Sequence, residues 1–186
     1  LSACVFSLTD KQILQTTFDG FFEQNKLPKP TTIVPCIDDA SAAKIVKFIG
    51  QILDKASRGS LNDLLSLPDL IKKFGDDLDP AVGKCLEGNA ELAALTPKYN
   101  PKNLTEDEIK KKVITYVTLH YLTVHKWLGE LDDLWHAGNY YQVGFKAAGY
   151  GHNVLSTSQE VKAEDFFKIS FPKQKHNHII KILKEL

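Results

Sequence analysis

The chain has 186 residues, 43% of them hydrophobic and 25% charged, which is typical of a single globular domain with a full core. Its 23 basic and 23 acidic side chains give a formal net charge of zero. This balance argues against general nucleic-acid binding, which needs a basic excess to displace counterions from phosphates. Arg58 is the one arginine of the sequence, so bidentate recognition of phosphate or carboxylate is not expected either.

The sequence contains no methionine and starts at Leu1. We interpret this start as the product of leader removal, which predicts a secreted or other lumenal protein; a truncated sequence is the alternative. No apolar run approaches the roughly 18 residues that a membrane-spanning helix needs. The sequence therefore predicts a protein without a transmembrane segment.

Helix signals dominate the first half of the chain. Thr9 and Gln12 have the spacing of a capping box, and apolar residues at helical spacing follow as far as Asn25. Three prolines predict an extended linker over 26–35. Further helices are expected over 39–58, over 61–74 with a new start at Pro68, and over 80–86, ended by Gly59, Gly75 and Gly88. Residues 96–104, with two prolines, are expected to form a loop.

The three cysteines are Cys4, Cys36 and Cys85, so at least one stays outside any internal disulfide. We expect a disulfide between Cys36 and Cys85, because both lie where neighbouring helices can touch. Pairing through Cys4 is one alternative, and three buried thiols in a reducing compartment are the other.

Asn103-Leu104-Thr105 has the form of an N-glycosylation sequon and lies in the predicted loop. Asn103 is therefore a candidate glycosylation site if the protein is secreted. Chance occurrence of the tripeptide is the alternative.

Residues 105–137 are expected to form one long helix. Thr105 and Glu108 have the spacing of a second capping box, and apolar residues recur at steps of three and four until Gly138. The stretch 113–124 is rich in β-branched residues and also fits a strand, but length, cap and spacing favour a helix.

A second helix, rich in glycine and alanine, is expected over 140–155. Gly144, Ala148 and Gly151 lie on one face of it, although each helical glycine costs about 1 kcal/mol relative to alanine. We therefore expect another backbone to approach this face closely, as small-residue faces allow in membrane helices. A broken helix with a loop over 148–152 is the alternative.

Beyond residue 156 the signals weaken. Alternating apolar residues over 163–171 predict a short strand or an extended arm. A stretch rich in lysine and histidine follows, and then a short amphipathic helix over 178–186. The apolar residues of interest in this last helix are Ile179, Ile182, Leu183 and Leu186.

The sequence contains no HExxH, Gly-x-Ser-x-Gly or P-loop motif. Asp133 and His136 share a helix face, but a di-iron bundle needs two such pairs and further glutamates. An exposed ion pair is expected instead. We predict a non-enzymatic protein with no metal site and no cofactor.

These signals together predict an all-α fold, an irregular multi-helix bundle of one domain over 1–186. The long helix over about 105–137 is expected at its centre, with the glycine- and alanine-rich helix packed across it. We expect the protein to pack against a protein partner or copies of itself, as a homo-oligomer or larger assembly. The expected interface residues are Gly144, Ala148, Gly151, Ile179, Ile182, Leu183 and Leu186.

The alternative function is a helical carrier of a lipid or another apolar ligand. Aromatic residues gather between positions 116 and 150, and tyrosine and tryptophan combine a flat apolar face with a polar group. The lining expected for such a carrier consists of Phe18, Phe22, Phe48, Tyr116, His120 and Tyr121.

Overall fold

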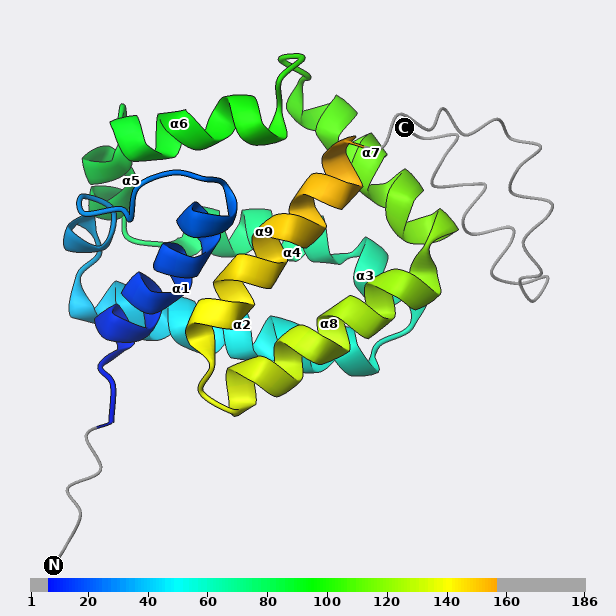
Figure 1. Cartoon of the computed structure of the whole chain (residues 1–186), viewed down its shortest axis with the longest axis horizontal. Coiled ribbons are helices and arrows are strands. Elements are labelled where there is room, and N and C mark those ends of the chain that lie inside the picture. The colour runs from blue at the N-terminus through cyan, green and yellow to red at the C-terminus, as the bar shows by residue number, and fades with distance from the viewer. Residues whose placement is uncertain (1–6, 157–186) are drawn as a thin grey trace, which may run out of the picture.

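The computed structural model describes residues 7–156, which form nine α-helices, one short 3-10 helix and no strand. The elements in chain order are α1 (Asp10–Gln24), η1 (Val34–Cys36), α2 (Asp39–Arg58), α3 (Leu61–Leu65), α4 (Leu67–Asp77), α5 (Pro80–Leu86), α6 (Ala90–Tyr99), α7 (Glu106–Leu119), α8 (Tyr121–His136) and α9 (Tyr140–Ser156). The predicted all-α, irregular multi-helix bundle is confirmed (Figure 1). The arm and helix predicted beyond residue 156, with Ile179, Ile182, Leu183 and Leu186, lie outside the described residues, as does Cys4.

Several helix starts follow the predicted capping signals. The side chains of Thr9 and Thr105 cap α1 and α7, and both predicted capping boxes are present. Asp38 caps α2, and Asp79 caps α5 just before its first-turn proline. Each cap gives a partner to a backbone N–H that the helix itself leaves free, so these starts depend on local sequence alone.

The helix predicted over 105–137 is divided at His120. Its backbone there has φ −117° and ψ 32°, outside the helical region, and α7 and α8 run in different directions on either side (Figure 1). Two residues earlier, the buried Thr118 donates a hydrogen bond from its hydroxyl to the carbonyl of Ile114 at 2.8 Å. Such back-bonding competes with the backbone ladder and bends helices, and the β-branched stretch around it has low helix propensity.

Helix α9 packs most extensively against α1, and less extensively against α8 and α7. A Cβ atom added to Gly144 would clash with the carbonyl of Thr17, and one added to Gly20 would clash with the carbonyl of Tyr141. The close backbone approach expected at Gly144 is thus present. However, the partner is α1, whereas the sequence predicts the 105–137 helix as the neighbour.

Two further boundaries differ from the sequence prediction. Helix α6 continues through Pro97 to Tyr99, so the first part of the predicted 96–104 loop is helical. Pro97 lies in the last turn, where its missing N–H removes a single hydrogen bond, and the Tyr99 hydroxyl is fixed by Asn25. Gly75 does not end α4, which continues to Asp77. Helix α9 is continuous over 148–152, where a loop was the alternative prediction.

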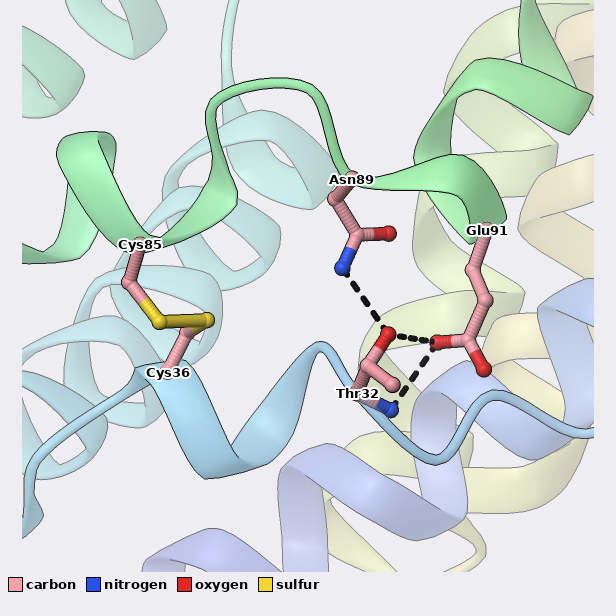
Figure 2. Close-up of a disulfide and its surroundings, with 5 residues drawn as sticks. All are labelled: Thr32, Cys36, Cys85, Asn89 and Glu91. Carbon is pink, nitrogen blue, oxygen red and sulfur yellow. Dashed lines mark hydrogen bonds between the residues drawn. A yellow bond between two sulfur atoms is a disulfide. The ribbon is translucent and has the colours of Figure 1, made fainter.

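The predicted disulfide between Cys36 and Cys85 is present and joins η1 to α5 (Figure 2). Beside it, Glu91 of α6 accepts hydrogen bonds from the backbone N–H and the hydroxyl of both Thr31 and Thr32. Asn89 donates a further bond to the Thr32 hydroxyl at 2.9 Å (Figure 2). The linker after α1 is therefore held covalently at its end and by polar contacts at its middle.

Candidate functional site

Helix α4 is amphipathic but contains no buried residue. Four apolar residues recur at steps of three and four along one side of it: Leu67, Leu70, Ile71 and Phe74, here called the α4 face. Ile71 leaves 54% of its surface exposed. An amphipathic helix of a globular protein ordinarily buries its apolar stripe, whereas the α4 face is only partly covered in the described structure.

Leu67, Leu70 and Phe74 of the α4 face are half-buried, and contacts within the chain are defined at both ends of the face. The ring of Phe74 stacks on that of Phe48 in α2, with centroids 3.8 Å apart. Leu67 packs against the core cluster that α2, α3, α7 and α8 build. Phe48, expected to line a ligand cavity, thus lies at the edge of the α4 face.

Exposed ion pairs connect the other side of α4 to α7. Lys72 lies 3.2 Å from the carboxylate of Glu106, with 65% and 77% of these side chains exposed, and Asp69 lies 3.0 Å from the ammonium of Lys110. The hydrogen bond and charge of Glu106 raise the pKa of Lys72. Solvent screens ion pairs this exposed, so they hold α4 only weakly.

The ends of α4 are only partly favourable: Pro68 and Asp69 in its first turn suit a helix start, but a side-chain cap is lacking and the last turn is acidic. Its N-cap residue, Ser66, makes no capping hydrogen bond from its side chain. Asp76 and Asp77 lie in the last turn, where the helix dipole disfavours negative charge. Helix α4 is consequently a marginal helix with an incompletely covered apolar stripe.

A second surface feature is a row of half-buried aromatic rings from α7, α8 and α9, here called the aromatic stack. Its members are Tyr116, His120, Trp127 and Tyr150. The ring of Tyr116 lies 4.4 Å from that of His120 and 6.0 Å from that of Trp127, which stacks on Tyr150 at 4.5 Å. The stack joins three helices at the position where the 105–137 segment bends.

Glu130 fixes one end of the aromatic stack. Its carboxylate accepts hydrogen bonds from the ammonium of Lys146 and the hydroxyl of Tyr150. These two bonds lower the pKa of Glu130, whereas burial and the neighbouring carboxylate raise the pKa of Tyr150. Tyr150 therefore stays protonated, and the stack is held in one geometry by polar contacts as well as by ring packing.

The residues expected to line one apolar cavity do not lie together. Tyr116 and His120 are neighbours in the aromatic stack, and Tyr121 packs against the same core cluster as Tyr116. Phe22 is fully buried, and Phe18 packs against the separate core cluster of α1, η1, α2 and α5. The predicted lining is therefore divided among several packing sites.

The small-residue face expected at an intermolecular interface is occupied inside the chain. Gly144 and Ala148 are buried, the former against α1, and a Cβ atom on Gly151 would lie 3.1 Å from the ring of Tyr99. The carbonyl of Ala148 also accepts a hydrogen bond from the Tyr99 hydroxyl at 3.2 Å. This face therefore packs against α1 and Tyr99 of the same chain.

The buried Asp132 joins α8 to α2, a contact that the sequence did not reveal. Its Oδ2 accepts a hydrogen bond from the hydroxyl of Ser57 at 3.1 Å, and its Oδ1 lies 3.2 Å from Nδ1 of His136. The same Nδ1 lies closer to the backbone carbonyl of Asp132, at 2.9 Å, and within the described residues the buried Oδ1 has no hydrogen-bond partner. The partner of His136 is thus Asp132 and not Asp133. The carboxylate lies between serine and histidine, so this is not the order of a catalytic triad.

No protein family, curated protein or solved structure matches this chain. Within residues 7–156, no helix has the length and apolar character that crossing a membrane requires. The class defined by the fold is thus an all-α, disulfide-containing helical bundle.

Proposed function

We propose that this protein is a secreted interaction protein that packs the α4 face against another protein, in the first instance a second copy of this chain. The observation that carries the proposal is an amphipathic helix with no buried residue and with Ile71 54% exposed. Burial of apolar surface is the main favourable contribution to association, and a half-covered helical stripe offers such surface.

The charge balance supports self-association. The chain has a formal net charge of zero, so two copies meet without net electrostatic repulsion. A single apolar stripe also suits a two-fold symmetric contact, in which each copy presents the same face. The Cys36–Cys85 disulfide supports the secreted compartment, because such bonds persist mainly in oxidising environments.

Sedimentation velocity of the full chain over a series of concentrations tests the proposal. We expect a concentration-dependent shift from monomer to dimer, and Ile71→Asp should weaken dimerisation at least about tenfold by placing a charge in the contact. Circular dichroism would check that the exposed substitution leaves the fold intact.

Leu122→Asp is the matched control, because Leu122 is 80% exposed on α8 and lies outside the α4 face. It should dimerise like the wild type. A wild-type chain that stays monomeric throughout, or equal weakening by both substitutions, would refute self-association through this face.

The alternative is binding of an apolar ligand at the aromatic stack, favoured by half-exposed rings held in a fixed geometry. Sodium oleate is a suitable probe, because Trp127 belongs to the stack and reports on its surroundings by fluorescence. Saturable quenching that Tyr116→Ala weakens would support this function. A spectrum unchanged by oleate would exclude fatty-acid binding there.

A further inference from the structure

Asn103 lies in the loop between α6 and α7, at the top of Figure 1. It is exposed and has a positive φ of 49°, a conformation that asparagine adopts more readily than most residues. Its backbone N–H donates to the carbonyl of Asn100 at 3.3 Å, which closes a turn. The residue therefore lies on a tight, solvent-facing turn between two helices.

The neighbouring asparagine holds this turn in shape. The side-chain amide of Asn100 donates to the carbonyl of Leu104 at 2.9 Å, and its oxygen accepts from the Leu104 N–H at 2.8 Å. Within the described part of the chain, no group bonds the side-chain amide of Asn103. Asn100 thus stabilises the loop, and the side chain of Asn103 can carry a substituent without loss of a hydrogen bond.

We propose that Asn103 is an N-glycosylation site, an inference that rests on the secreted compartment of the proposed function. The co-reactant is an oligosaccharide linked through pyrophosphate to a membrane lipid. Nδ2 of Asn103 forms a bond with the anomeric carbon of the first sugar and loses one proton. The bond between that carbon and the pyrophosphate oxygen breaks, and the protonated lipid pyrophosphate leaves.

The third residue of the sequon has two separate roles. Thr105 is exposed, as the acceptor tripeptide requires, and its hydroxyl also accepts the N–H of Glu108 at 3.3 Å as the N-cap of α7. Serine preserves both roles. Aspartate preserves the cap but destroys the sequon, so this pair separates modification from folding.

The test is expression of the full chain behind a secretory leader in eukaryotic cells, followed by intact mass with and without amide-cleaving glycosidase. The intact mass is measured for protein from the medium and from the membrane fraction, so a chain that stays inside the cell is also detected. The sequence has this one sequon, so we expect the wild type and Thr105→Ser to lose the mass of one glycan on treatment. Thr105→Asp and Asn103→Gly should show the bare polypeptide mass throughout.

Asn62→Gln changes an exposed asparagine outside any sequon and should retain the glycan. A wild-type mass unaffected by the glycosidase in both fractions, or a glycan that persists in Thr105→Asp, would overturn the proposal. The sedimentation test of the α4 face uses unglycosylated bacterial protein, so the two proposals fail independently.

Discussion

At the scale of single residues, two glycines set the distance between α1 and α9. Gly20 faces the carbonyl of Tyr141, and Gly144 faces the carbonyl of Thr17. No side chain fits at either position unless the backbones move apart. Glycine is disfavoured inside helices by about 1 kcal/mol, so the close contact must offset that loss.

Replacement of Gly20 by alanine should therefore destabilise the protein by about 1–3 kcal/mol, as overpacking of a core does. Gly129→Ala is the control, because Gly129 lies within α8 and has nothing within 4 Å of an added Cβ atom. This second change should stabilise by about 0.5–1 kcal/mol. Urea unfolding of both variants gives the two values, and a tolerated Gly20→Ala would contradict the close approach.

Glu91 is the second residue with a defined physical role. Burial raises its pKa, but the hydrogen bonds from Thr32 and Thr31 outweigh this and lower it to about 2 from a usual value of 4.5. A carboxyl whose pKa is lower in the folded state stabilises that state above pH 4.5. This contribution is lost as the pH falls towards 2.

Glu91→Gln should accordingly lower the free energy of unfolding by about 1 kcal/mol at pH 7. The difference in unfolding free energy between this variant and the wild type should shrink as the pH falls from 4.5 towards 2. Urea unfolding at several pH values measures this difference, with Glu87→Gln as a control on an exposed glutamate whose side chain accepts no hydrogen bond from residues 7–156. If the difference in unfolding free energy is the same at pH 7 and pH 2.5, the contribution of the Glu91 contacts does not depend on the charge of Glu91.

At the scale of elements, α4 and the bend at His120 depart most from the expected pattern. The sequence predicted a helix start at Pro68 and the amphipathic stripe, but it did not predict that the stripe stays partly open. In α7 and α8, cap and periodicity predicted helix throughout. The bend follows the buried Thr118, whose hydroxyl bonds the carbonyl of Ile114, and the apolar periodicity does not report this contact.

Hydrogen exchange should detect the weak attachment of α4. Its amides, over 67–77, should exchange faster than those of α1 and α9, because α4 contains no buried residue and is held by exposed ion pairs and by apolar contacts at its two ends. Mass spectrometry of peptides from the exchanged full chain measures this order. Equal protection of α4 and α9 at low concentration would indicate that α4 is held by contacts beyond those described.

At the scale of the whole molecule, the disulfide and the helix crossings join segments far apart in the chain. Cys36 and Cys85 are separated by 49 positions, and the closed loop between them contains α2, α3 and α4. Tyr99 of α6 meets Asn25 at the end of α1 and the carbonyl of Ala148 in α9. These contacts connect the first and last described helices through the middle of the chain.

Loss of the disulfide should cost about 3–4 kcal/mol, because the unfolded chain regains the entropy of a loop of this length. The double variant Cys36→Ser/Cys85→Ser should unfold at the same urea concentration as the reduced wild type. Cys4→Ser is the control and should keep the stability of the oxidised wild type. If Cys4→Ser instead lowered stability as much as the double variant, the disulfide would involve Cys4.

The sequence by itself determined the helical class, most helix starts, the disulfide pair and the need for a close neighbour at Gly144. These features depend on capping, periodicity and backbone sterics, which act over a few residues, or on the small number of cysteines available. Only the tertiary structure decided that α1 is this neighbour, that the segment 105–137 bends at His120, and that α4 keeps Ile71 exposed. Those outcomes depend on which apolar faces meet across the chain, and a periodic pattern specifies a face without specifying its partner.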